Sequence, residues 1–175
     1  LGGNKVQGRP IGGGGRVAAP TEPAAAVQRA AERFAASAAA AGCELVTQPG
    51  AAPGLLVACH HSDLDRILDV LLENAIAYAP GAPIELTAEG PLISVRDHGP
   101  GLVPGEEETV FERFHRGRVA VSTGVSGTGL GLAIARELAR RWGGDVTVEP
   151  APGGGALARV RLVPAPFAKS SPERV

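Results

Sequence analysis

Asn74 and Tyr78 are the first pair in this 175-residue sequence whose types and spacing suggest binding chemistry. They are four residues apart in a helix pattern, so both side chains face one side of the helix, at the edge of an apolar stripe. An amide oxygen can ligate Mg²⁺ without adding negative charge beside phosphates. A tyrosine ring offers a flat surface to a base. A helical asparagine taken alone is more often a solvated surface residue, so the pair needs support from other positions.

The second candidate is Asp97, which ends an apolar stretch and begins the sequence Asp-His-Gly-Pro-Gly at residues 97–101. A carboxylate at this point can accept a hydrogen bond from an exocyclic amine, while Gly99 and Gly101 let the backbone pass close to a ligand. An ordinary turn after a strand is the alternative that this motif leaves open.

The third candidate is the glycine-rich segment Gly-Thr-Gly-Leu-Gly-Leu at residues 127–132, which opens a helix pattern. Unpaired N–H groups at a helix start, beside glycines that admit a phosphate, form an anion site. No Gly-Lys-Ser/Thr follows, so the segment is not a Walker loop. No regular strand precedes it, as a dinucleotide fingerprint requires, so an NAD-dependent enzyme is a distant alternative.

The elements that must position these residues follow from hydrophobic periodicity and breakers. We expect helices at 21–41, 62–79 and 128–142, and strands at 44–48, 55–59, 84–88, 92–97, 145–149 and 156–162. Thr21 is the expected cap of the first helix, and Ser62 or Asp63 that of the second. The order predicts an α+β fold: a two-layer sandwich with a mixed, mostly antiparallel sheet, covered on one face by three helices.

Length and composition set the remaining limits. The formal net charge of −1 gives no support for a nucleic-acid partner, and no apolar run is long enough to insert into a membrane. Residues 1–20 are rich in Gly and Pro and are expected to be a flexible linker, and residues 164–175 a loose tail. Cys43 and Cys59 are expected to be core thiols. The absence of any Met suggests a piece of a longer protein.

The three motifs occur together and in an order that resembles the histidine-kinase branch of the Bergerat-fold ATPases. Leu-Leu-Glu-Asn-Ala at 71–75 is similar to that family's N box, residues 97–101 to its first glycine box and 127–132 to its second. Val-Phe-Glu-Arg-Phe-His-Arg-Gly at 110–117 resembles its phenylalanine box, which borders a mobile ATP lid. The resemblance covers residues 21–163 as one ATP-binding catalytic domain, with the lid at about 102–127.

The resemblance implies a role for each matching residue. Asp97 would read the adenine amine, with Tyr78 and Leu102 flanking the ring, and Asn74 would hold Mg²⁺ against the triphosphate. Arg116, and also Arg113, would bring positive charge to the γ-phosphate. The implied catalytic residues are Asn74 and Arg116. The full set implied to bind ATP is Asn74, Tyr78, Asp97, Gly99, Gly101, Leu102, Arg113, Arg116, Gly127, Thr128, Gly129, Leu130, Gly131 and Leu132.

Two positions depart from the family pattern. Val70 stands where the family usually has a second polar residue, and Ala77 stands where Lys or Arg is common. Both changes remove groups that would face phosphate or metal, so we expect weaker ATP binding than in a member that carries both. Val70 also separates the chain from the gyrase, heat-shock and anti-sigma branches, which typically have Glu there. Glu73, turned about 100° from Asn74, is interpreted as a surface residue.

The activity implied is transfer of the γ-phosphoryl group of ATP to a histidine on a separate dimerisation domain of the same parent protein, and then to an aspartate of a response regulator. His60 and His61 do not have the sequence context of the acceptor, and His98 and His115 are interpreted as loop side chains without a role. The fragment would be a cytoplasmic domain of a membrane-anchored sensor.

Two other functions are left open by the sequence. A degenerate module could bind ATP and signal through lid order without transferring phosphate, which Val70 and Ala77 favour. An anti-sigma serine kinase would need a sigma-factor surface that the sequence does not reveal.

Overall fold

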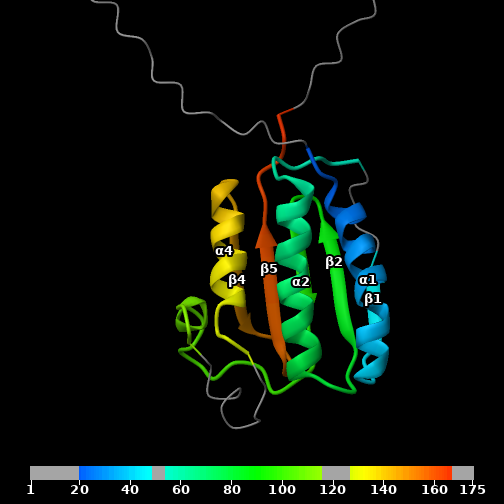
Figure 1. The fold of residues 1–175 in the computed structure, drawn as a ribbon, viewed down its shortest axis with the longest axis vertical. Helices are drawn as coiled ribbons and strands as arrows, with labels where there is room; N and C mark the ends of the chain where they lie inside the picture. The colour runs from blue at the N-terminus through cyan, green and yellow to red at the C-terminus, as the bar shows by residue number, and fades with distance from the viewer. Residues whose placement is uncertain (1–19, 49–53, 116–126, 167–175) are drawn as a thin grey trace, which may run out of the picture.

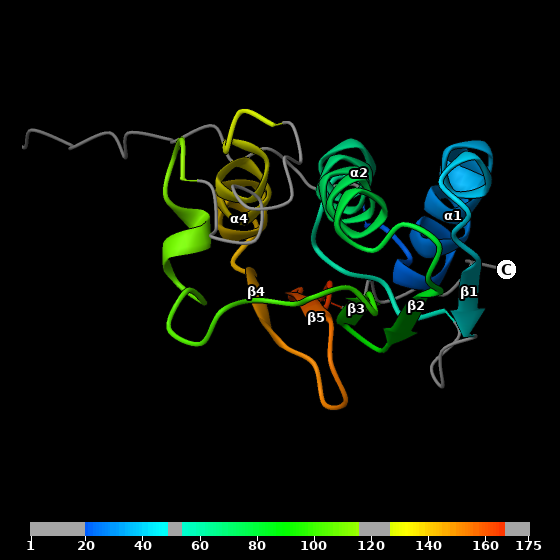
Figure 2. The same cartoon turned by 90° about the horizontal axis from the view of Figure 1, so that it is seen from below.

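The computed structural model describes residues 20–48, 54–115 and 127–166. Within these residues the chain forms two layers, and three α-helices lie side by side on one face of a five-stranded sheet (Figures 1 and 2). The predicted α+β sandwich is therefore confirmed. The helices are α1 (Pro23–Ala40), α2 (His61–Tyr78) and α4 (Gly131–Arg141), with a short 3₁₀ helix η1 (Thr109–Phe111). The strands are β1 (Leu45–Gln48), β2 (Ile84–Glu89), β3 (Leu92–Arg96), β4 (Asp145–Pro150) and β5 (Ala156–Arg161).

The sheet is mixed, with the strand order β1-β2-β3-β5-β4. β1 pairs with β2 in parallel, and the other three pairs are antiparallel. Alternation along β2 turns Ile84, Leu86 and Ala88 inward, whereas the residues between them are only partly buried. The helix-covered face of the sheet is therefore the apolar one.

The central helix α2 supplies much of the core because its apolar residues recur with helical spacing. Its fully buried side chains are Leu64, Ile67, Leu68 and Leu72. Trp142, just after α4, donates its indole N–H to Asp63 at the start of α2 over 2.8 Å. α2 is thus fixed along its length, so residues near its C-terminal end have well-defined positions.

The strand predicted at 55–59 is wrong. Only Val57 forms bridges, to Thr21 on one side and to Pro164 on the other. Pro164 has no N–H to continue a ladder, so pairing stops there. These bridges bring the two ends of the described domain together, at the end opposite the C-terminal end of α2 (Figure 1).

The predicted helix caps are also wrong, and one start is displaced. Thr21 donates its hydroxyl to the carbonyl of Cys59 over 2.7 Å, and Glu22 precedes α1 without a side-chain cap. His60 caps α2 by accepting the N–H of Ser62. The third helix begins at Gly131, not at residue 128, because Gly129 has a φ of 69°, outside the right-handed helical region.

Candidate functional site

The three predicted motifs meet around one cavity of about 430 Å³. Its lining comes from α2, from the segment that follows β3, from the sheet strands β3, β4 and β5, and from the start of α4. The residues predicted from sequence that line it are Asn74, Tyr78, Asp97, Gly101, Leu102, Gly127, Thr128, Gly129, Leu130, Gly131 and Leu132. Positions up to 58 residues apart in the chain are thus brought together.

Asp97 is held at the buried end of this cavity, with only 8% of its surface exposed. Its Oδ1 accepts the N–H of Gly99 over 2.9 Å and the N–H of Ala156 over 3.1 Å. Within the described ranges, no hydrogen bond uses Oδ2. Two backbone donors therefore orient the carboxylate and leave one oxygen available for an amine donor.

Glycines near Asp97 are required by close packing. A Cβ at Gly99 would lie 2.5 Å from the carbonyl oxygen of Tyr78. A Cβ at Gly101, where φ is 72°, would lie 2.5 Å from the carbonyl oxygen of Gly155. These contacts hold the turn against α2 and against the β4–β5 connection. Gly99 itself does not line the cavity, so its contribution is to the position of Asp97.

α2 presents Asn74 and Tyr78 to the cavity from one face, and both are half-buried. No side-chain hydrogen bond joins Asn74 to another described residue. Ala77 is exposed, whereas Val70 is only 2% exposed and packs against the start of α4. A Cβ at Gly131 would lie 3.2 Å from Val70 Cγ1, so α2 and α4 are in close contact at this level.

The start of α4 crosses the end of the phenylalanine-box segment. Phe114 donates its N–H to the carbonyl of Gly129 over 3.0 Å, and a Cβ at Gly129 would lie 2.5 Å from the carbonyl oxygen of His115. α4 has no side-chain cap and no acidic residue in its first turn. Its first N–H groups therefore keep the positive end of the helix dipole facing the cavity.

Of the two predicted cations, only Arg113 is described by the structure, and it is not brought into the cavity. Arg113 points outward, with 69% of its side chain exposed, and pairs with Glu137 over 3.2 Å. Arg116 lies outside the described residues, as do the other residues of 116–126 in the predicted lid.

Among the lining residues that were missed or discounted in the sequence are Arg66, Glu73, Glu106, Val110 and His115. Nε2 of His115 is buried and has no hydrogen-bond partner among the described residues. The signal that could have indicated His115 is its place between Phe114 and Arg116, in a motif that adjoins the ligand. For Arg66, the signal in the sequence was its spacing: it precedes Val70 by four residues and Asn74 by eight.

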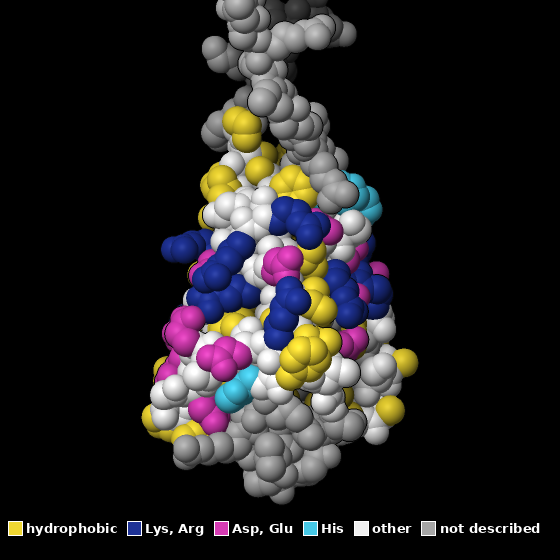
Figure 3. All heavy atoms as spheres, turned by 60° about the vertical axis from the view of Figure 1, so that its left-hand side comes forward, with side chains coloured by type: hydrophobic (Ala, Val, Ile, Leu, Met, Phe, Trp, Pro, Cys, Tyr) yellow, Lys and Arg dark blue, Asp and Glu magenta, His cyan; other side chains and the backbone are white. Residues whose placement is uncertain are grey.

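An ionic cluster, defined here as Arg136, Arg140, Glu108 and Asp145, joins η1 to α4 and β4. Arg136 bonds to Asp145 over 2.9 Å and to Glu108 over 2.6 Å, and its guanidinium lies 4.4 Å from the centre of the Phe111 ring. Arg140 also bonds to Asp145. Figure 3 shows basic and acidic side chains mixed across the face that includes α4.

The ion pairs shift the pKa values of the cluster. Hydrogen bonding and charge from Arg136 lower the pKa of Glu108. Burial acts to raise the pKa of Asp145, but hydrogen bonds from Arg136 and Arg140 outweigh it, and the net direction is downward. The pKa of Arg136 is raised by the same two carboxylates. Glu108, Asp145 and Arg136 are therefore charged at neutral pH.

The sequence pattern of the family described as "Histidine kinase-, DNA gyrase B-, and HSP90-like ATPase" matches residues 59–166, more than half of the chain. That span contains every cavity residue named above. The chain belongs to this ATPase family.

Curated relatives narrow the class further. The chain is 40% identical over 128 residues to the sensor histidine kinase component HK1 of Mycobacterium tuberculosis, covering 71% of this chain and 73% of HK1. It is 44% identical over 104 residues to the sensor protein KdpD of Escherichia coli, covering 56% of this chain and 11% of KdpD. Within the ATPase family, the chain is thus of the sensor histidine kinase type.

Solved structures agree with this placement. The mycobacterial sensor histidine kinase MprB superposes with a TM-score of 0.71 at 27% identity, covering 86% of this chain and all of the MprB chain. The structure described as the ATP binding domain of PrrB from M. tuberculosis gives 0.65 at 28% identity, covering 85% and 97%.

The chain spans only about a tenth to a quarter of several sensor kinases that it matches, among them KdpD of E. coli and YkoH of Bacillus subtilis. Within the described ranges, no helix has both the length and the apolar character needed to cross a bilayer.

Proposed function

We propose that this domain binds ATP with Mg²⁺ and donates the γ-phosphoryl group to a histidine on a separate dimerisation domain of its parent sensor kinase. The observation that carries the proposal is the cavity itself. It combines a backbone-oriented aspartate at its buried end, an unbonded asparagine on α2 and an uncapped helix start. Each group is suited to a different part of one nucleotide.

The adenine would bind at the buried end. Asp97 Oδ2 would accept the exocyclic amine, because Oδ1 is already used by two backbone N–H groups. Tyr78 and Leu102 would flank the ring, and Gly101 would let the ring approach the backbone. A fixed acceptor of this kind favours adenine over guanine, which presents a carbonyl at the same position.

The phosphates would extend along α2 towards the start of α4. Residues Gly127, Thr128, Gly129, Leu130, Gly131 and Leu132 would surround them, with backbone N–H groups as donors. Asn74 fits a magnesium ligand, because its amide has no bond to another described residue and Mg²⁺ commonly takes few protein ligands beside phosphates. When bound, the ion would neutralise charge on the phosphates. No cluster of three or more His, Cys, Asp or Glu that could hold a metal alone occurs among the described residues.

In the transfer step, a bond forms between the γ-phosphorus and a ring nitrogen of the acceptor histidine. The bond between the γ-phosphorus and the β–γ bridging oxygen breaks, and ADP is released. Arg116 would stabilise the charge that develops on the transferring group. Arg113 would have to leave Glu137 to do the same. The phosphoryl group would pass later to an aspartate of a response regulator. The parent protein would be anchored in the cell membrane, with this domain in the cytoplasm.

The first test is calorimetric titration of the chain with ATP and Mg²⁺, beside its Asp97→Asn variant. The amide keeps the size of the carboxylate but places an N–H₂ group against the backbone donors or against the adenine amine. We expect saturable binding in the wild type and a loss of about a hundredfold or more in the variant. An unchanged affinity in the variant would contradict the adenine assignment.

The second test adds a histidine-containing dimerisation domain and radioactive ATP. Labelling of the added domain, with none on this chain alone, is the expected result. Stable self-labelling of this chain would contradict the view that its histidines are not acceptors.

A degenerate ATP-sensing module is the second candidate. The apolar Val70, the uncharged Ala77 and the outward-facing Arg113 favour it. Binding of ATP without labelling of any supplied acceptor domain would support that module over a kinase. Release of a sigma factor on addition of ATP would support the anti-sigma alternative instead.

A further inference from the structure

The cavity carries little positive charge of its own. Among the described lining residues, the acidic side chains are Glu73, Asp97 and Glu106, and Arg66 is the single Lys or Arg. A nucleoside triphosphate bound there would bring several more negative charges. Arg66 is therefore the described group whose charge matters most for the ligand.

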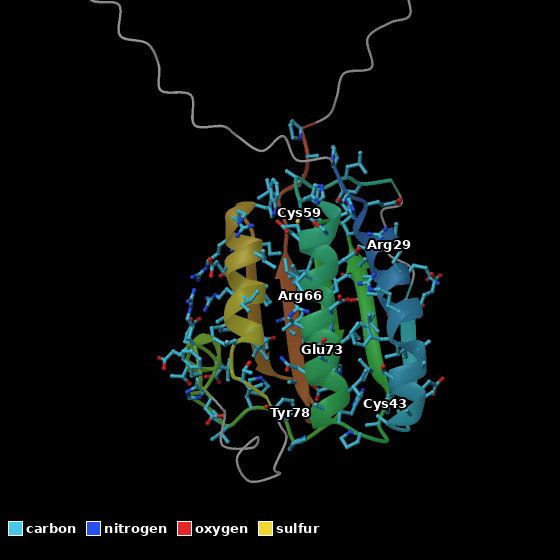
Figure 4. The ribbon with its side chains drawn as sticks, viewed as in Figure 1. Arg29, Cys43, Cys59, Arg66, Glu73 and Tyr78 are labelled. Carbon is cyan, nitrogen blue, oxygen red and sulfur yellow. The ribbon has the colours of Figure 1, made fainter. Side chains whose placement is uncertain are left out.

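Arg66 lies in line with the residues that would contact the nucleotide. Arg66, Val70, Asn74 and Tyr78 are spaced four residues apart on α2, each turned about 40° from the one before, and all four line the cavity. At about 1.5 Å of rise per residue, Arg66 is about 12 Å from Asn74 and about 18 Å from Tyr78 along the axis. Figure 4 shows the order along α2, with Tyr78 at its lower end, Glu73 above it and Arg66 higher still.

The start of α4 lies close to this line. Gly131 is packed against Val70, one turn from Arg66 towards the C-terminus of α2. The uncapped N–H groups of α4 and the guanidinium of Arg66 therefore flank the same stretch of the cavity. A nucleotide whose base reaches Asp97 would place its last phosphates between them.

Arg66 is also available for a ligand. Other arginines on the described helices are engaged in ion pairs: Arg29 with Asp65, Arg33 with Asp69, Arg136 and Arg140 with Asp145, and Arg141 with Asp63. Arg66 is exposed and forms no ion pair or side-chain hydrogen bond with a described residue. A ligand phosphate would not have to compete with an existing carboxylate partner.

We infer that Arg66 binds the terminal phosphate and makes this site selective for a nucleoside triphosphate over a diphosphate. The inference rests on the proposed ATP site and adds a residue that its motifs do not contain. It also supplies positive charge along the same face of α2 that has Val70 and Ala77 in place of polar or basic residues.

The test compares ATP, ADP and AMP binding to the full chain and to its Arg66→Gln variant, with Mg²⁺ present. We expect Arg66→Gln to weaken ATP binding about tenfold and to change ADP and AMP binding less than about twofold. Arg66→Lys should retain part of the preference for ATP. Arg161→Gln is the matched control, because Arg161 is an exposed arginine on β5 that does not line the cavity. Melting temperatures of all variants should agree.

Each other outcome has a distinct meaning. Equal loss of ATP and ADP affinity, or no loss of either, would overturn the assignment of Arg66 and leave the ATP site in place. Unchanged ATP binding with slower transfer to an added acceptor domain would overturn it too, and would indicate that Arg66 contacts that domain. Failure of the wild type to bind any of the three nucleotides would overturn the proposed function itself, and this inference with it.

Discussion

The cavity has two walls that are built in different ways. The inner wall, defined as α2 with the sheet strands and residues 97–101, consists of long periodic elements with a continuous buried core. The outer wall, defined as residues 102–115 with the turn at 127–130, has one three-residue 3₁₀ helix, and no residue of that helix is fully buried. Phe114 in this wall has a φ of 64° and is 74% exposed.

The difference shows how stability is distributed around the site. Core packing and backbone hydrogen bonds fix the inner wall, so it should open only when the whole domain unfolds. The outer wall is connected to the body chiefly by the ionic cluster, and the bond from Phe114 to Gly129 joins its own two segments. It should therefore respond to single substitutions that leave the global stability almost unchanged.

The largest expected effect is a loss of stability when a glycine of the inner wall is replaced by alanine. At Gly101, a Cβ would meet the carbonyl of Gly155 and the φ is left-handed, so Gly101→Ala should lower the free energy of unfolding by about 3 kcal/mol. Gly105→Ala in the outer wall is the control, because its φ is also positive but no atom lies within 4 Å. Gly105→Ala should lower the free energy of unfolding by only about 1 kcal/mol. Urea unfolding measures both, and equal losses would contradict the comparison.

Removing the main contact of the outer wall should reduce affinity more than stability. Arg136→Ala breaks the bonds to Glu108 and the contact with Phe111, so we expect ATP binding to weaken about tenfold, while the melting temperature falls by only a few degrees. Arg140→Ala removes a second arginine from Asp145 without touching η1. It should leave ATP binding within about twofold of the wild type. If the two variants weaken binding equally, the cluster does not act through the outer wall.

A smaller effect, an increase in ATP affinity, is expected from restoring charge to the inner wall. Ala77 is exposed in the cavity, so Ala77→Lys should tighten ATP binding about three- to fivefold by titration. Val70→Asn should increase ATP affinity less, because an amide at this buried position loses its hydrating water and has no evident hydrogen-bond partner. If neither substitution tightens binding, the departures from the family pattern are not what limits affinity.

The smallest expected effect is on how the stability of the domain depends on pH. The pKa of Asp145 is lowered from its usual 3.8, so the folded state holds its proton less tightly than the unfolded chain does. The resulting stabilisation is complete above pH 3.8 and is lost as pH falls through the lower folded value. Asp145→Asn should therefore lower the melting temperature by a few degrees at pH 7, and the difference from the wild type should shrink below about pH 4. A difference that stays constant down to pH 3 would exclude this carboxylate as the cause.

The inner wall was the part of the site that the sequence predicted well. Asn74 lies beside an apolar stripe of helical period, and Asp97 ends an alternating strand, so the elements themselves fix where these side chains point. The helix-covered mixed sheet followed from the same periodic signals. The isolated Val57 bridge did not, because five apolar residues in sequence do not reveal whether a partner strand exists.

The outer wall was predicted less well because its geometry depends on individual tertiary contacts. Arg113 faces Glu137 and not the cavity, and His115 lines the cavity although it was discounted. Neither orientation follows from a periodic pattern. Arg66 was missed for a different reason: its spacing to Val70 and Asn74 could be read in the sequence, but that spacing does not identify a ligand contact until the opposite side of the cavity is known.

The bridges from Val57 to Thr21 and to Pro164 have a mechanical consequence. They gather the two ends of the described domain at one extremity, while Tyr78 lies at the other (Figure 4), with the turn that follows Asp97 packed against it. α2, with 18 residues, forms a lever about 27 Å long between them. A rotation of about 20° at the bridged end would carry the adenine end of the cavity through about 9 Å, given that length. A small change of angle outside the domain could thus move a bound nucleotide by several bond lengths without deforming the site.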